Sequence, residues 1–262
     1  LGAAGLVIAL LLSVPLWSVF GSIFSNDAGA WAHIRATVLP DLITNSLLLA
    51  VSVGLGVTLI GTLTAWLTAT FEFRGRAAFE WMLILPLAMP AYVMAYAYTD
   101  ALQYAGPVQT TLREWLGWQS RGDYWFPDVR SLGGATAMLM FVLYPYVYVL
   151  ARVAFLEQSA SMAEAGRTFG FARMGVFWHV SLPLARPAIA AGAALALMET
   201  LADYGTVSYF GIPAFTTGIF NAWFSQGDRI SAAKLAVILL VFVACVVAAE
   251  HAARRRLRFH QA

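Results

Sequence analysis

Two acidic residues, Glu199 and Asp203, lie four residues apart within a long apolar run. If the run is helical, this spacing places both carboxylates on one face. Charged groups inside a bilayer are costly, so they face a polar path or a polar partner. Carboxylate and phenolate oxygens suit hard cations, which adds the next residue, Tyr204, to the set. We predict that Glu199, Asp203 and Tyr204 line a polar pathway. The alternatives are pairing with polar groups of neighbouring helices and a position near the outer interface.

A second group of residues lies between two apolar runs, in the stretch SMAEAGRTFGFARMGVFWHVSLPLARP, residues 161–187. Ser161 and Glu164 form a capping box, and Gly170 can end the helix that they begin. One face of this short helix consists mostly of small residues: Met162, Ala165, Gly166 and Phe169. Such a face allows close approach to another surface. The pattern alone leaves two interpretations open, which are docking into a protein groove and an amphipathic connector on the lipid surface.

The elements that position these residues are apolar helices. Sixty per cent of the 262 residues are hydrophobic and 11% are charged, a composition that indicates a membrane protein. The net charge of +2 gives no indication of nucleic-acid binding. We predict an all-α fold, a polytopic transmembrane bundle in a single domain over residues 1–262. Its six spans are residues 5–24, 42–71, 77–99, 132–156, 187–210 and 231–252. Leu182 and Pro183 are expected to break the helix before the fifth span begins.

Two features within the spans concern packing. The second span carries small residues at helical spacing: Gly54, Thr58, Gly61 and Ala65. They favour close packing of this helix in the bundle. Prolines interrupt the third and fourth spans at Pro86, Pro90 and Pro145. Kinks at these positions suit a gate, but proline is also common in membrane helices generally, and both readings stay open.

Arginines indicate the orientation of the bundle. They gather after the second span, around residues 161–187 and at the C-terminal end. The positive-inside rule then places this polar segment and both termini in the cytoplasm. Two stretches on the opposite side, AGPVQTTLREWLGW and FTTGIFNAWFSQGD, predict short outer helices at the membrane interface. These helices either dock an external partner or anchor the chain in the membrane.

Catalytic motifs are absent from the sequence. There is no phosphate-binding GxxxxGK[ST] loop, the single lysine is Lys234, and the four histidines are scattered. We therefore expect no catalytic residues, no metal site and no cofactor in this chain, and we do not expect an enzyme. If the chain takes part in active transport, the energy must come from another subunit.

The polar segment resembles the EAA signature of permease subunits of bacterial ABC importers. Glu164-Ala165-Gly166 is followed by Gly170 and by Val180-Ser181-Leu182-Pro183, with Gly166 and Val180 as mild departures from the pattern. The resemblance extends over nearly the whole chain, and LPLAMPAYVMAYAYTDALQYAGPVQTTLR and ETLADYGTVSYFGIPAFTTGIFNAWF are similar to iron(III)-type permeases. It implies a coupling helix that contacts a cytoplasmic ATPase through these residues: Glu164, Ala165, Gly166, Gly170, Leu182 and Pro183.

The resemblance also implies partners and a cargo. These are a dimer of the ABC ATPase, a periplasmic substrate-binding protein, a second permease half and the lipid of the bacterial inner membrane. The implied cargo is ferric iron, with thiamine, polyamines and phosphonates as alternatives. Iron-type permeases usually carry two such segments in one chain, and this chain has one. We therefore expect the N-terminal half of a fused permease, or alternatively a homodimerising subunit. A rival class is a proton-coupled transporter that uses Glu199 and Asp203.

Overall fold

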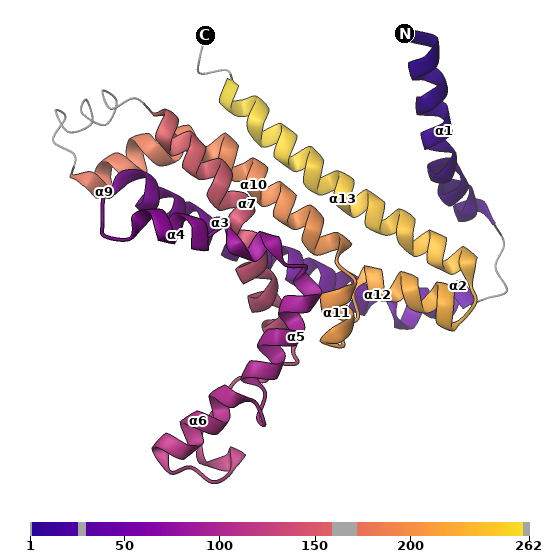
Figure 1. The fold of residues 1–262 in the computed structure, drawn as a ribbon. Helices are drawn as coiled ribbons and strands as arrows, with labels where there is room; N and C mark the ends of the chain where they lie inside the picture. The colour runs from indigo at the N-terminus through magenta and orange to yellow at the C-terminus, as the bar shows by residue number, and fades with distance from the viewer. Residues whose placement is uncertain (1, 26–29, 159–171, 259–262) are drawn as a thin grey trace.

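The computed structural model describes residues 2–25, 30–158 and 172–258. The regular elements in these residues are all helices, which confirms the all-α prediction for this part of the chain (Figure 1). Four helical stretches are long and apolar enough to cross a membrane, and a bent pair makes up to five. They are Leu39–Thr70 (α3), Leu132–Glu157 (α7), Met174–Ala202 (which includes α10, Leu182–Ala202) and Arg229–Ala248 (within α13, Arg229–Arg258).

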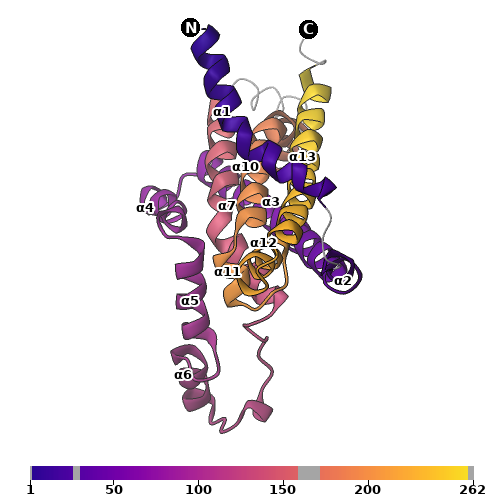
Figure 2. The same cartoon turned by 90° about the vertical axis from the view of Figure 1, so that its right-hand side faces the viewer.

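Helices α3, α7 and α10 form the centre of the bundle, where they lie side by side (Figure 2). Their crossing point is the fully buried Val147 of α7. A Cβ atom on Gly61 of α3 would lie 2.6 Å from Val147 Cβ, and one on Gly192 of α10 would lie 2.6 Å from Val147 Cα. Glycine at both positions therefore lets two helices approach the α7 backbone. The predicted close packing of the second span is confirmed at Gly61.

Three of the predicted spans correspond to single helices. The second, fourth and sixth predicted spans match α3, α7 and α13 to within a few residues, except that α13 extends further at its C-terminal end. Pro145 lies inside α7 without ending it. The opening run forms α1 (Gly2–Gly21), which packs against α13 and leads through η1 (Ser22–Phe24) to α2 (Ala30–Thr37). Helix α1 is not one of the four span-length stretches, so the six-span count stays a prediction.

The third predicted span, residues 77–99, is not one continuous helix. It consists of α4 (Arg76–Met82), the short η2 turn (Leu85–Ala88) and α5 (Ala91–Leu102), and the chain bends by 105° at the break. Two prolines explain the break, because Pro86 lies in the η2 turn and Pro90 precedes α5 as its N-cap. Neither proline supplies the N–H group that a continuous helix needs. This segment is therefore bent and interrupted, not the straight helix that was predicted.

The two predicted outer helices exist, but they have different surroundings. Helix α6 (Pro107–Leu116) lies at the end of the molecule opposite to the N- and C-terminal ends (Figures 1 and 2). Helix α12 (Phe215–Phe220) packs against α13 and α3, with Phe215 only 2% exposed. The interfacial position of this helix stays a prediction, and its Phe215 side chain packs inside the bundle. Phe215 joins the small core cluster around Leu42 and Leu235.

Candidate functional site

The predicted coupling segment falls mostly outside the described residues. Four of its residues lie within residues 159–171, namely Glu164, Ala165, Gly166 and Gly170. The structure does describe the two ends that flank it. Helix α7 ends at Glu157, and the chain is described again from residue 172. Gln158 Nε2 donates a hydrogen bond to the carbonyl oxygen of Ser181 at 3.0 Å, which joins the two ends.

The segment is followed by an anchored turn. Helix α9 (Arg173–Val176) leads into a π-helical turn (Phe177–Ser181) that continues directly into α10. Phe177 is 3% exposed, and its ring lies 4.5 Å from that of Trp66 on α3 and 6.3 Å from that of Phe155 on α7. The turn is therefore packed against both central helices.

Leu182 and Pro183 lie within a helix, which corrects the prediction that they break it. Helix α10 begins at Leu182, places Pro183 in its first turn and continues through Pro187 to Ala202. Helical turns also precede Pro183, so its missing N–H group falls within a continuing helical stretch and not at a free helix start. The wider π-helical turn before it keeps the chain helical. The predicted start of the fifth span at residue 187 is wrong for the same reason.

The two predicted pathway acids have different hydrogen-bonding surroundings. Helix α10 ends at Ala202, and Asp203 follows it with extended backbone, ψ 125°. The Asp203 carboxylate accepts hydrogen bonds from the backbone N–H groups of Thr206 and Val207 at 2.9 and 3.1 Å, and from the Thr206 hydroxyl at 3.1 Å. It therefore caps the short helix α11 (Gly205–Tyr209). The predicted end of the fifth span at residue 210 is wrong, because this cap starts a new helix.

The other two predicted pathway residues remain accessible. Glu199 lies exposed on α10, and among the described residues its carboxylate makes no hydrogen bond or ion pair. The Tyr204 ring stacks on that of Phe220 in α12 with 4.5 Å between centroids. The two acids therefore differ in role: the Asp203 carboxylate is structural, and the Glu199 carboxylate has no hydrogen-bond or ion-pair partner among the described residues. Of the two acids, Glu199 is the one whose carboxylate is exposed and makes no hydrogen bond within the described residues.

This difference gives a prediction on stability. Changing Asp203 to alanine should lower the free energy of unfolding by about 1–2 kcal/mol, because three hydrogen-bond donors lose their acceptor. Changing Glu199 to glutamine should leave the stability unchanged, since its carboxylate has no partner. Thermal unfolding of both variants in detergent micelles checks the pair. Equal destabilisation by the two substitutions would contradict the assigned roles.

One charged cluster is absent from the sequence-based predictions. Glu80 of α4 accepts from Arg76 Nε at 2.9 Å and pairs with Arg152 Nη2 of α7 at 2.7 Å. The Arg76–Glu80 spacing of four residues is a recognisable helix pair. Arg152 is distant in sequence, so its pairing needs the fold. Both arginines were predicted only as markers of the cytoplasmic side, whereas here they join α4 to α7.

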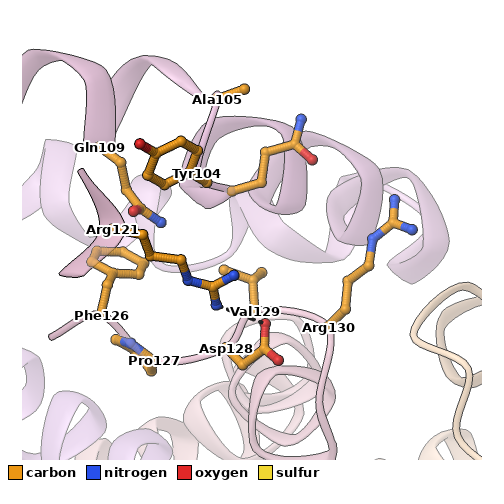
Figure 3. A pocket seen from close by; sticks show the side chains of 10 residues that line it. Tyr104, Ala105, Gln109, Arg121, Phe126, Pro127, Asp128, Val129 and Arg130 are labelled. Atoms are coloured by element: carbon orange, nitrogen blue, oxygen red, sulfur yellow. Dashed lines mark ion pairs between the residues drawn. The ribbon is translucent and has the colours of Figure 1, made fainter. Parts of the chain in front are cut away.

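A pocket of about 350 Å³ lies in the predicted outer loop, lined by residues within 103–109 and 121–130 (Figure 3). Arg121 points toward Asp128, with 3.8 Å between Nη2 and Oδ1, whereas Arg130 points away from this pair. Arg130 instead donates to the Tyr209 hydroxyl of α11 at 3.2 Å. Its guanidinium links the outer loop to the helix that Asp203 caps. Two guanidinium groups in one polar loop suit contact with an anionic group.

The loop around this pocket is held by local hydrogen bonds. Arg113 Nη1 donates to the Tyr104 carbonyl and to the Tyr124 hydroxyl, both at 2.9 Å. Asp123 accepts from the backbone N–H groups of Gln119 and Ser120 at 2.8 Å. Hydrogen bonding from Ser120, and then from Gln119, lowers the pKa of the Asp123 carboxyl below its usual value. The outer loop is therefore a defined structure rather than a loose connector.

Residues 2–25, 30–158 and 172–258 contain no group of three or more His, Cys, Asp and Glu side chains that could hold a metal ion. The described acids act instead as a cap, as an ion-pair partner or as a free carboxylate. Within this part of the chain, the structure offers no preformed metal centre.

Comparison with known families decides the class of the chain. The family described as the binding-protein-dependent transport system inner membrane component matches residues 58–258. The chain belongs to this family. The match covers the three central helices from the middle of α3 onward, the bent α4–α5 segment and α13. The permease is therefore an inner-membrane component of a binding-protein-dependent transport system.

Individual relatives differ in the cargo that their names give. The permease is 24% identical over 249 residues to the Fe(3+)-transport system permease protein FbpB 2 of Haemophilus influenzae. This alignment covers 93% of this chain and 44% of that protein. It is 28% identical over 184 residues to the molybdenum transport system permease protein ModB of Escherichia coli. This second alignment covers 68% of this chain and 77% of that protein. The chain thus spans less than half the length of the iron relative.

Solved structures share the fold. A bacterial alginate ABC transporter, in complex with a periplasmic protein that holds an alginate pentasaccharide, matches with a TM-score of 0.75 at 15% identity. The match covers 97% of this chain and 94% of that chain. The MetNI methionine ABC transporter in inward-facing conformations matches with a TM-score of 0.65 at 15% identity, over 86% of this chain and 97% of that chain. The permease has the helical arrangement of these importer subunits.

Proposed function

We propose that this chain is one of the two permease halves of an ATP-driven ABC importer that takes up ferric iron. Its membership of the permease family supports the importer class, and relatives of this kind are transport components rather than enzymes. The choice of ferric iron as the cargo rests on the match to an Fe(3+)-transport permease over 93% of the chain. The exposed Glu199 carboxylate, a hard oxygen ligand without a partner among the described residues, is consistent with a cationic cargo.

We propose that residues 159–171 hold the helix that contacts the ATPase. Glu164, Ala165, Gly166 and Gly170 would form its contact surface, with the energy coming from a separate ATPase dimer. The anchored turn at Phe177 supports this role, since it connects the end of that segment to α3 and α7. Leu182 and Pro183 would then serve as the rigid start of α10 rather than as a hinge.

The remaining partners follow from the same proposal. A periplasmic binding protein would deliver the cargo to the outer loops, at the end where α6 lies. A second permease half, in the same chain or as a second copy, would complete the pathway that Glu199 and Tyr204 line. Both ends of the described chain lie away from α6, as the proposed cytoplasmic termini in a bacterial inner membrane require (Figure 2).

Molybdate is the second candidate cargo, because a molybdenum permease aligns with 68% of the chain at 28% identity. The two cargoes have opposite charge, since ferric iron is a cation and molybdate an oxyanion. Arg121 and Arg130 in the outer loop would suit an anion, whereas Glu199 would repel one. The charge preference of uptake therefore separates the two candidates.

Uptake into proteoliposomes tests the proposal. The vesicles should hold the full permease, its ATPase and its binding protein, with radiolabelled ferric iron or molybdate outside. We expect ATP-dependent iron uptake that Gly170→Asp abolishes, because the change would jam the coupling helix. The control is Gly133→Asp, at an exposed glycine in the first turn of α7 where an added Cβ would meet only Ser131 Oγ at 3.7 Å, and it should retain most of the uptake.

Three outcomes would revise this proposal. Uptake of molybdate alone would keep the importer class and replace the cargo. Uptake that needs no ATP and collapses with an uncoupler would favour a proton-coupled transporter. Full activity of the Gly170→Asp variant would remove the coupling role from residues 159–171.

A further inference from the structure

A groove of about 470 Å³ lies between α3 and the start of α10. Leu59 and Leu63 of α3 form one wall, and Ile189, Ala190 and Ala193 of α10 form the other. Leu59 is 62% exposed and Leu63 is 42% exposed, so the groove opens outward. Both walls belong to helices long and apolar enough to cross a membrane. An apolar groove between two such helices opens to hydrocarbon chains of the bilayer.

The wall of this groove contains an unsatisfied hydroxyl group. Thr62 is only 6% exposed, and its Oγ1 atom has no hydrogen-bond partner among the described residues. Two other threonines on the same helix donate their hydroxyl hydrogen bonds to backbone carbonyls. Thr64 donates to the carbonyl of Ile60 at 2.7 Å, and Thr68 donates to the carbonyl of Thr64 at 2.9 Å. The Thr62 oxygen itself is buried below the surface of the groove, so it is not a contact for a ligand there.

The groove carries a positive charge near the start of α10. Arg186 lines it and is exposed, and no carboxylate of the described residues forms an ion pair with it. Trp178 in the π-helical turn lies along the same groove and is 58% exposed. Arginine and tryptophan at the end of a membrane helix are typical of contact with lipid headgroups. The charge complements an anionic phosphate.

We propose that this groove binds one anionic phospholipid of the leaflet on the side where α10 begins. The phosphate lies against Arg186, and an acyl chain lies along Leu59, Leu63 and Ala193. Phe177 also lines the groove, so the lipid contacts the turn that anchors the predicted coupling segment. The site rests on the helices and their side chains, and it is independent of the cargo.

Native mass spectrometry of the permease, released with its partner subunits from nanodiscs of equal phosphatidylglycerol and phosphatidylcholine, tests this site. We expect one phosphatidylglycerol retained per permease chain. Arg186→Gln should lower its retention about fivefold, as expected for one arginine near the membrane surface. Ala193→Phe should fill the groove and remove the adduct. Arg74→Gln is the matched control, since Arg74 is also exposed, and should leave retention unchanged.

Several results would overturn the proposal. These are equal retention in wild type and Arg186→Gln, an equal loss in Arg74→Gln, and no preference for phosphatidylglycerol over phosphatidylcholine. Displacement of the adduct by inorganic phosphate alone would show a free-anion site instead of a lipid site. A cross-link from Trp178 to a neighbouring protein chain would show that protein covers the groove. The Arg186→Gln variant replaces an exposed residue, so its thermal unfolding should match the wild type and confirm that it is folded.

Discussion

Replacement of Gly192 by leucine should prevent the permease from folding stably. A Cβ atom at this position would lie 2.6 Å from Val147 Cα and 2.7 Å from the Tyr146 carbonyl oxygen. These are backbone atoms of α7, so no side-chain rotation relieves the contact. Helix α10 must then move away from α7, which opens the central crossing. We expect a loss of about 3 kcal/mol, at the upper end of the usual cost of overpacking a core.

The measurement is thermal unfolding of the purified variant in micelles, together with its yield in the membrane. Gly54→Ala provides the control, because a Cβ there would lie 3.1 Å from Leu197 Cδ2, the flexible end of a side chain. That variant should lose little stability. Gly192→Leu with wild-type stability would show that α7 and α10 are not held together at Val147.

Loss of the Phe177 ring should separate ATP hydrolysis from transport. Phe177→Ala removes a buried aromatic side chain that packs on Trp66 and Phe155, so it should cost about 3 kcal/mol of stability. It should also weaken the connection from the predicted coupling segment to α3 and α7. We expect the ATPase still to assemble with the permease and to hydrolyse ATP, while uptake per ATP falls severalfold.

The matched control is Met174→Ala, three residues earlier in the same stretch, where the side chain is 53% exposed. Both variants should be assayed in proteoliposomes for cargo uptake and ATP hydrolysis in the same preparation. A proportional fall in both rates for Phe177→Ala would mean that the variant is merely less folded. A normal ratio of uptake to hydrolysis would remove the coupling role from this turn.

The exposed groove between α3 and α10 and the anchored turn share Phe177, so the two proposals can be tested together. Lipid retention in the Phe177→Ala variant reports on the groove, and uptake reports on the coupling. Retained lipid with lost coupling would show that the turn acts through α3 and α7 rather than through the lipid. This separation is possible because Arg186 and Leu63 lie on the helices and not in the turn.

Sequence alone was sufficient for the helices whose stability is local. Apolar length is a property of a single stretch, so α3, α7 and α13 were predicted close to their observed ends. The family was also recognisable, since four spaced elements of its signature lie within residues 164–183. The break in the third predicted span was missed, although Pro86 and Pro90 gave a signal for it. Whether prolines kink or break a helix depends on packing around them.

The tertiary structure decided the roles of the individual polar residues. Glu199 and Asp203 share a spacing that suggests one common role, yet only Asp203 accepts hydrogen bonds from the N–H groups of α11. Glu80 forms its second ion pair, with Arg152 of α7, only because the fold brings the two side chains together. A polar side chain in a membrane bundle takes whichever partner the neighbouring helices supply. Those neighbours are set by long-range packing, which no local sequence pattern encodes.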